Sequence, residues 1–253
     1  MRSRLVISFA GLLLAAGCGG DDTTTVTVRE TVTETAASTV PSEAPTLVSL
    51  YFLQDGKVWP EQRGIVSGPA IATTTINQLF EGTESELTSA IPPETRLRGL
   101  TISGEVASVE LEPPVTDRKA LAQLAYTLTQ FDTVERVSFN GDPPVGRPAF
   151  EAETPAILVE SPLSGEAVES GFDVTGTANT FEATFQYELR DSAGKVLTKD
   201  FVTATSGSGT RGTFRFTVSY EASGPQMGRL VVFEISAEDG SRTNERVTPL
   251  ALR

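Results

Sequence analysis

The sequence predicts two β-rich domains: an α+β domain over residues 46–148 and an all-β, immunoglobulin-like sandwich over residues 155–253. Two patterns favour this division. The first region alternates β-prone apolar runs with two segments of helical periodicity, whereas the second contains only short β-prone runs separated by turns. With 253 residues, 39% of them hydrophobic, the chain is long enough to build two cores.

Composition excludes several kinds of chemistry. The chain has no histidine and one cysteine, so it cannot form a Ser-His-Asp or Cys-His triad, a His-ligated metal site or an internal disulfide. The 20 basic and 33 acidic residues give a net charge of −13, which opposes binding to nucleic acid. We therefore expect no cofactor, no metal and no nucleic-acid partner.

The amino terminus has the pattern of a signal peptide over residues 1–17. Arg2 and Arg4 precede an apolar run too short to span a bilayer stably. The ending Leu-Ala-Ala-Gly-Cys resembles a bacterial lipobox, although alanine stands three residues before Cys18. The resemblance implies that Cys18 carries lipid and anchors the chain at the extracytoplasmic face of the cell membrane. The alternative is an ordinary secretory signal followed by an incidental cysteine.

Residues 18–45 begin with the lipidated cysteine and continue as a segment rich in Thr, Glu, Ala and Pro that has no aromatic residue. Such a composition cannot bury enough apolar surface to offset chain entropy, which predicts a disordered tether. Its Thr-Val alternation leaves an additional edge strand as the alternative. Loss of Arg2 and Arg4 with the signal peptide would take the net charge from −13 to −15, which an anionic membrane surface repels.

Each element of the first domain has its own signal. One helix is indicated by Ala72, Ile76, Leu79 and Phe80, which recur on one face and stop at Gly82. A second helix is expected from about 117 to 129, with Thr116 as its cap. The expected strands are 47–53, which ends at a turn over 54–56, then 62–66, the hairpin strands 96–102 and 106–111, and 134–139. Together these elements predict two helices on a mixed sheet.

Several short stretches of this region resemble the GerMN domain of GerM-like sporulation and germination proteins. The resemblance is carried in order by Gln78-Leu79-Phe80-Glu81-Gly82, Leu87-Thr88-Ser89-Ala90-Ile91-Pro92, the run from Gln123 to Phe131, and Val137-Ser138-Phe139-Asn140-Gly141. It implies a non-catalytic, extracytoplasmic domain of envelope assemblies, similar in build to ring-building motifs of secretion-like complexes.

The second domain shows seven short strands and no helical signal. They are expected at 157–160, 172–176, 184–189, 196–202, 213–218, 229–236 and 242–250. The stretches Val159-Glu160-Ser161-Pro162, Phe172-Asp173-Val174-Thr175-Gly176 and Glu238-Asp239-Gly240-Ser241 resemble the Gmad2 domain, an immunoglobulin-like module found beside GerMN. The order of the two resemblances agrees with that pairing.

Tyr126 and Gln130 are the candidate interface residues of the first domain. They stand four positions apart on the second expected helix, so they could share a polar and aromatic face that is open to a partner. The alternative is that both simply pack inside the domain. The single Trp59 has two similar interpretations, as a packed anchor or as a platform for a sugar ring.

Other patterns resemble catalytic motifs without their context. The glycines at 207, 209 and 212 have dinucleotide-site spacing, but a strand rather than a helix is expected to follow. The Ser-x-x-Lys at 192–195 falls in a turn, and its companion motifs are missing. The carboxylate pairs could act in a glycosidase or bind calcium, or could be ordinary surface; they are Glu84/Glu86, Glu110/Glu112 and Glu151/Glu153.

These observations predict a non-enzymatic, membrane-anchored envelope lipoprotein that contacts other envelope proteins or peptidoglycan. Two alternatives stay open at this point. One is a peptidoglycan-active hydrolase that uses a carboxylate pair. The other is a glycan-binding module without turnover.

Overall fold

The computed structural model describes residues 45–66 and 68–253. The predicted signal peptide, the lipid site at Cys18 and nearly all of the predicted tether lie outside these residues. Within the described part of the chain, no helix combines the length and apolar character needed to cross a membrane.

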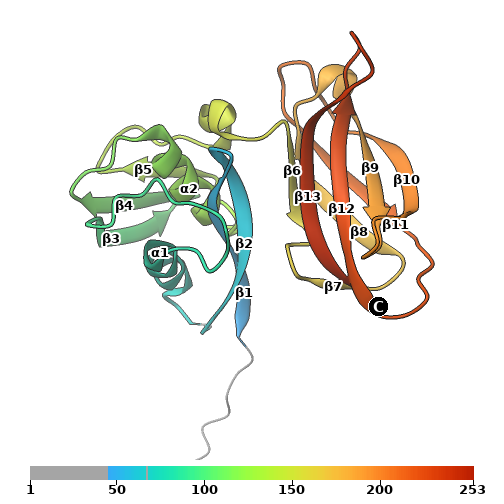
Figure 1. Ribbon diagram of the computed structural model, residues 1–253. Coiled ribbons are helices and arrows are strands. Elements are labelled where there is room, and N and C mark those ends of the chain that lie inside the picture. The colour runs from blue at the N-terminus through green and yellow to red at the C-terminus, as the bar shows by residue number, and fades with distance from the viewer. Residues whose placement is uncertain (1–44, 67) are drawn as a thin grey trace, which may run out of the picture. The chain divides into compact units, whose positions relative to one another are not determined.

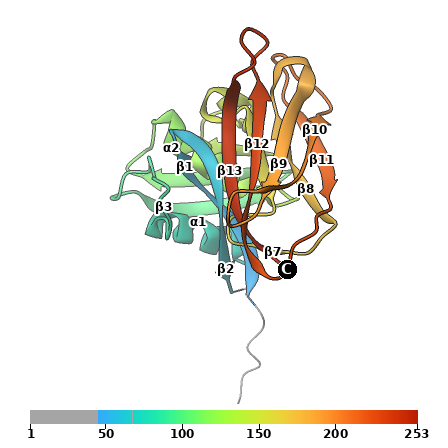
Figure 2. The same cartoon turned by 45° about the vertical axis from the view of Figure 1, so that its right-hand side comes forward.

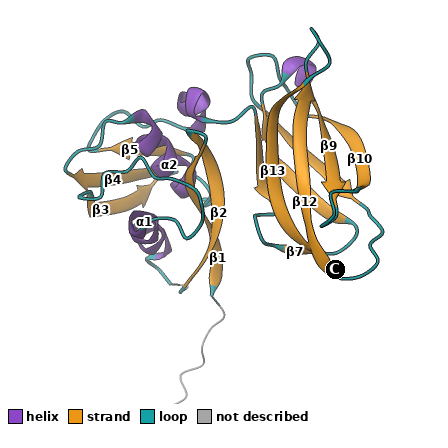
Figure 3. Cartoon of the chain, in the orientation of Figure 1, coloured by secondary structure: helices purple, strands orange, loops and turns teal. Residues whose placement is uncertain are grey.

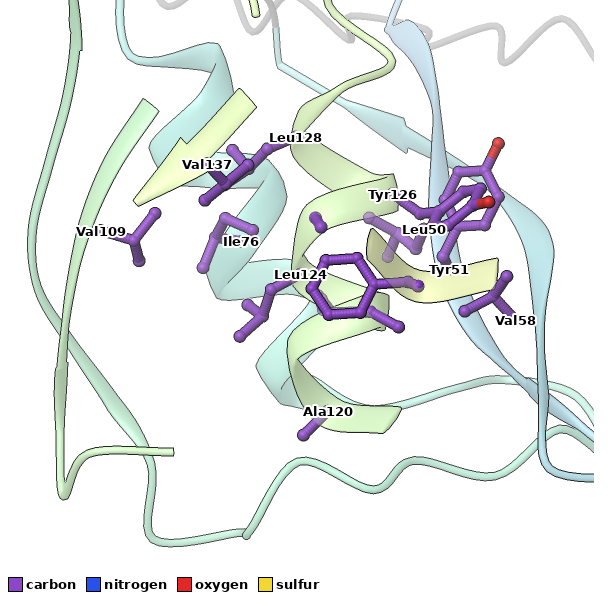
Figure 4. Packing of buried hydrophobic residues seen from close by; sticks show 14 of the residues in the cluster. Leu50, Tyr51, Val58, Ile76, Val109, Ala120, Leu124, Tyr126, Leu128 and Val137 are labelled. Carbon is purple, nitrogen blue, oxygen red and sulfur yellow. The ribbon is translucent and has the colours of Figure 1, made fainter. Parts of the chain in front are cut away.

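Five strands and two helices form the first domain (Figure 1). The strands are divided between a hairpin, β1 with β2, and a three-stranded sheet in the order β3-β4-β5. Helices α1 and α2 lie between the hairpin and this sheet (Figure 4). The bounds are β1 Thr46–Gln54, β2 Lys57–Ile65, α1 Ile71–Glu81, β3 Arg96–Ser103, β4 Val106–Glu112, α2 Arg118–Leu128 and β5 Arg136–Phe139.

The three-stranded sheet is mixed, as predicted, because β4 runs antiparallel to β3 and parallel to β5. The predicted α+β class and the number of strands are confirmed. The structure adds that β1 and β2 form a sheet of their own on the other side of the helices. Hydrophobic periodicity marks each element but does not say which strands pair.

The β1–β2 hairpin extends further than its sequence indicates. Its turn, Asp55-Gly56, has φ values of 51° and 73°, which is the left-handed geometry that favours Asp-Gly in two-residue hairpin loops. Strand β2 therefore begins at Lys57 rather than near Gln62, and Trp59 pairs with Phe52. The expected strand was too short because Pro60, which usually argues against a strand, is tolerated where its missing N–H would face outward from a sheet edge.

Helix α2 begins one residue later than predicted and has a different cap. The side chain of Asp117, not Thr116, accepts hydrogen bonds from the backbone N–H groups of Lys119 and Ala120 at 2.9 and 3.0 Å. Its buried residues surround the helix and include the polar Gln123 and Thr127. An element packed on all sides has no wide solvent-facing stripe.

The first core lies around the two helices. Figure 4 shows Ile76 of α1 and Leu124 and Leu128 of α2 facing this core, with Val109 and Val137 from the sheet. All five side chains are at most 1% exposed. Leu50 and Val58 of the hairpin belong to the same cluster. Complete burial of such a side chain contributes about 1.5–3 kcal/mol, so the cluster holds the hairpin, helices and sheet together.

The second domain is a sandwich of two sheets, as predicted (Figures 1, 2 and 3). One sheet has the order β10-β9-β12-β13-β7 and the other β11-β8-β6. All seven expected strands are confirmed, and a two-residue strand, β7, joins them. The bounds are β6 Ile157–Ser161, β7 Ala167–Val168, β8 Phe172–Ala178, β9 Thr184–Arg190, β10 Val196–Thr203, β11 Gly212–Val218, β12 Gln226–Ile235 and β13 Arg242–Leu252.

A short 3-10 segment, η1 (Arg147–Glu153), precedes β6. Side chains of β6 belong to both cores: Leu158 packs with the first, while Ile157 and Val159 pack with the second. Alternation along a strand sends successive side chains to opposite faces. One strand therefore supplies apolar side chains to two clusters.

Strands β6 and β8 approach each other closely at Gly176 of β8. A Cβ atom at this position would lie 2.0 Å from the carbonyl oxygen of Leu158 and 2.7 Å from the Cζ of Phe214. Because a backbone atom cannot move aside cheaply, we expect Gly176→Ala to lower the free energy of unfolding by about 3 kcal/mol. Thermal unfolding followed by circular dichroism measures this change.

Gly68→Ala is the matched control, because a Cβ there meets nothing within 4 Å. It should leave the midpoint almost unchanged. Equal melting temperatures for the two variants would show that β6 and β8 do not approach this closely at Gly176.

Candidate functional site

The candidate site is the seam between β1 and α2, defined by Ser49, Tyr51, Gln123, Thr127 and Gln130. Backbone groups of β1 that face away from β2 would be unpaired without it. The Ser49 N–H donates to Gln130 Oε1, and Gln130 Nε2 donates back to the Ser49 carbonyl, both at 2.7 Å. The Tyr51 N–H donates to Thr127 Oγ1, and Gln123 Nε2 donates to the Tyr51 carbonyl, both at 3.0 Å.

These bonds let helix side chains take the place of a third strand. A primary amide carries one acceptor and two donors, so Gln130 can satisfy the N–H and the C=O of one residue together. Further along β1, Leu53 exchanges backbone hydrogen bonds with Thr88. The outer edge of β1 is thus closed along most of its length.

An aromatic and charged cluster adjoins the seam and consists of Tyr51, Tyr126, Arg147 and Glu160. The Arg147 guanidinium lies 4.6 Å from the ring centre of Tyr126 and 5.6 Å from that of Tyr51. It donates to Glu160 at 2.7 Å, and the Tyr51 hydroxyl donates to the same carboxylate at 2.5 Å. A cation stacked on two rings and paired with a carboxylate is well stabilised in a partly buried place.

Burial controls the ionisation of the two tyrosines. Burial first, and then the charge of Glu160, raise the pKa of Tyr51 well above its usual value. Burial also raises the pKa of Tyr126. Both hydroxyls therefore stay protonated and act as hydrogen-bond donors rather than as bases.

Tyr126 and Gln130 do not form an open face. Tyr126 is only 1% exposed, and its hydroxyl oxygen lies 2.7 Å from Thr154 Oγ1. The Gln130 side chain is partly buried and occupied by Ser49. The expectation of an exposed pair is corrected here, because strands and η1 cover the helix face that periodicity alone leaves open. Cys18 lies outside the described residues.

Arginines form salt bridges with both members of the Glu151/Glu153 pair. Arg211 binds Glu151 at 2.9 Å, and Arg118 binds Glu153 at 3.1 Å. The hydrogen bond from Arg211, more than any other contact, lowers the pKa of Glu151. A general acid in a glycosidase requires the opposite shift.

The other two pairs are exposed. Glu84 is 76% exposed beside Arg63, and Glu112 pairs with Arg98 on the surface. Glu86 and Glu110 are exposed as well. In the part of the chain that the structure describes, no three Asp, Glu or Cys side chains gather as a metal-ligand set. Trp59 is 5% exposed and packs in the first core, which agrees with the packed-anchor interpretation.

The glycine-rich motif runs from the connection between β10 and β11 into the first residue of β11, so a strand follows it as predicted, although the two strands belong to different sheets and form no hairpin. A Cβ at Gly207 would lie 2.5 Å from the carbonyl oxygen of Thr180, and one at Gly212 would lie 2.3 Å from the Ser206 nitrogen. Close packing of the loop explains these glycines. The Ser-x-x-Lys motif lies in the β9–β10 turn, where the Asp191 side chain accepts from the N–H groups of Ala193 and Lys195.

The second domain exposes large apolar side chains that hydrophobic periodicity does not predict. Phe181 and Phe201 are each 67% exposed, and Met227 is 54% exposed. Phe201 lies on β10, the outermost strand of its sheet. Its neighbour Val202 is buried, so strand alternation could have placed Phe201 outside, had the inward face been known.

Two family models match the chain. Residues 49–143 match Germane, described as sporulation and spore germination. Residues 156–241 match Gmad2, described as an immunoglobulin-like domain of bacterial spore germination. The chain carries a Germane domain followed by a Gmad2 domain. This confirms the GerM-like resemblance, and the matched ranges fall inside the α+β region and the sandwich.

Likeness to solved structures is weak. A candidate lipoprotein from Clostridium perfringens is 17% identical, with a TM-score of 0.30, and the match covers 44% of this chain and 93% of that one. CopC from Methylosinus trichosporium OB3b is 16% identical, at a TM-score of 0.24, covering 38% and 92%. WR4, an MSP family member from C. elegans, is 13% identical, at 0.24, covering 39% and 99%. A comparison with curated proteins gives no match.

Gln130→Ala tests the seam of the Germane domain. The change leaves the N–H and C=O of Ser49 without partners, so we expect the free energy of unfolding to fall by about 1–2 kcal/mol. Urea unfolding measures this loss. Gln186→Ala, at an exposed glutamine of β9, is the control and should cost almost nothing. If both variants unfold at the same urea concentration, Gln130 does not support β1.

Glu151→Gln tests the bond to Arg211 through pH. The lowered pKa means that the Glu151 carboxylate stabilises the fold above its ordinary pKa of 4.5. This contribution disappears as pH falls through the lower folded-state value. We expect the native chain to melt above the variant at pH 7, and the gap in melting temperature to close on acidification below about pH 4.5. A gap that does not change between pH 7 and pH 3 would contradict the assignment.

Proposed function

We propose that this chain is a non-enzymatic envelope lipoprotein, anchored through Cys18, whose Germane and Gmad2 domains contact other envelope proteins or the wall. The observation that carries the proposal is the presence of two sporulation and germination domains in one chain. The lipobox resemblance at Cys18 supports the anchor.

Side-chain chemistry also favours contact over catalysis. The candidate acid Glu151 is held as a carboxylate by Arg211, and the hydroxyls of Tyr51 and Tyr126 are held protonated by burial. By contrast, Phe181, Phe201 and Met227 present large apolar groups to solvent. Exposed aromatic and methionine side chains are enriched where proteins bind one another.

Cross-linking in cells tests the proposal. Tagged full-length chain is cross-linked, purified by the tag and compared with a Cys18→Ala variant. We expect one or two envelope proteins with the native chain and at least about tenfold less with the variant, since an anchored chain meets its partners at a higher effective concentration. The Cys18→Ala chain should accumulate as uncleaved precursor or be shed.

Cell-wall sacculi provide the contrary test. Release of sugar or peptide from sacculi by the purified chain, abolished by Glu151→Gln or Glu110→Gln, would replace the proposal with a peptidoglycan hydrolase. Co-sedimentation without release, together with no captured protein, would narrow the proposal to a glycan-binding module that contacts the wall alone.

A further inference from the structure

Strand β3 is the outermost strand of the β3-β4-β5 sheet of the Germane domain. Its hairpin with β4 has a two-residue turn, Gly104-Glu105, and pairs Ser103 with Val106 and Thr101 with Ser108. In such a hairpin these two pairs exchange the inner hydrogen bonds. The N–H and C=O groups of the intervening residues, Leu100 and Ile102, therefore point outward.

These outward groups have no hydrogen-bond partner among the described residues. The other edges of the domain are closed or interrupted. Gln123, Thr127 and Gln130 close β1, Pro60 interrupts β2, and Val145 bonds to Val137 of β5. Proteins usually block strand edges, so an edge left open over an exposed stretch indicates strand addition.

We propose that β3 pairs antiparallel with β3 of a second copy of this chain, across a two-fold axis at Thr101. In this register Leu100 lies opposite Ile102 of the second copy, and Ile102 lies opposite Leu100. The two pairs use all the outward N–H and C=O groups of both residues, which gives four hydrogen bonds. An isologous contact of this kind closes as a dimer.

In this register the side chains of β3 are complementary to those of the second copy. Leu100 is partly buried against the first core, and Ile102 is 39% exposed, so pairing one with the other extends an apolar surface that already exists. The two copies of Thr101, exposed on the opposite face, form a cross-strand pair, which is a favourable combination.

The charges at the two ends of β3 also favour antiparallel pairing with a second copy. The first half of β3 carries Arg96 and Arg98, and the turn that follows the strand carries Glu105. Antiparallel pairing brings the cationic start of one strand near the anionic end of the other. Arg98 remains 63% exposed beside Glu112, so it is accessible to a second carboxylate.

Strand β10, an edge strand of the five-stranded Gmad2 sheet, lacks this complementarity. On β10, the Phe201 N–H is already bonded to the Asp200 side chain, so the outward residues are Lys199 and Phe201. A two-fold pairing through these two residues would place Asp200 opposite its own copy, and like charges directly opposite are destabilising. The second copy is therefore assigned to β3.

Thr101→Cys in the full-length chain tests the dimer. Directly opposed residues of a non-hydrogen-bonded pair have Cβ atoms about 4.5–5.5 Å apart, within reach of a disulfide after slight adjustment. We expect mild oxidation of membranes to give a covalent dimer on a non-reducing gel. The unsubstituted chain, whose only cysteine is Cys18, reports any cross-link through that residue.

Ser108→Cys is the matched control, because Ser108 is exposed and lies beside Thr101 one strand further in. Two copies of Ser108 would be separated by three strand spacings, about 14 Å. We expect at least about tenfold more dimer with Thr101→Cys, a difference that distance alone explains. Equal yields would overturn the proposal.

Two further changes separate the contact from folding. Added to Thr101→Cys, Ile102→Lys or Glu105→Lys should each abolish most of the dimer, whereas Ile235→Lys, at an isoleucine 43% exposed, should not. Dimer that persists in both of the first two variants would overturn the proposal. So would a cross-linked product whose mass shows a different protein on the β3 edge.

This inference names a partner within the proposed contact function but does not depend on it. Ile102→Lys that loses the dimer and still captures envelope proteins leaves the proposed function in place. Dimer formation with neither captured envelope protein nor binding to sacculi supports the pairing and removes that function.

Discussion

The outer edge of β1 imposes a constraint on which the rest of the Germane domain depends. Backbone N–H and C=O groups that are buried without partners cost about 1–3 kcal/mol each, and no third strand continues past β1. The chain meets this demand with Gln123 and Thr127 of α2 and with Gln130 just beyond its end. The helix must therefore lie alongside the strand with these polar side chains turned inward. The apolar residues of α2 then face the remaining sheet, which fixes the order of layers.

The same constraint explains why the buried aromatic and charged residues of the domain have structural rather than catalytic roles. Tyr126 lies on α2 between Gln123 and Thr127, whose side chains bind β1, so it is drawn into the core with them and contacts Thr154. Arg147 covers its ring and that of Tyr51, and Glu160 neutralises the guanidinium. Polar and aromatic groups in this domain serve mainly to satisfy one another. This packing leaves strand edges and exposed side chains of the sandwich accessible to solvent.

Prediction from the sequence succeeded where periodicity and local turn chemistry decide the structure. The helix at Ile71–Glu81, the hairpin around Gly104-Glu105 and all seven long strands of the sandwich follow from apolar spacing and glycine-containing turns. Prediction failed where contacts with residues distant in the sequence determine the structure. Pro60 hid the middle of β2. Asp55-Gly56 marked a turn but did not show that β1 and β2 form a sheet separate from β3-β4-β5. Gln130 showed polar character but not the backbone it binds. Thr116 and Asp117 are both acceptable caps, and only the helix start distinguishes them.

The strand β6 serves both cores, and the segment leading into it is buried: Glu153, Thr154 and Pro155 are all largely inaccessible. Connections between domains are normally the places where proteases cut, because an enzyme must draw several extended residues into its own cleft. Here cleavage at the boundary would require Leu158 to leave one cluster while Ile157 and Val159 disturb the other. The buried boundary between the two domains is thus a poor site for proteolytic cleavage.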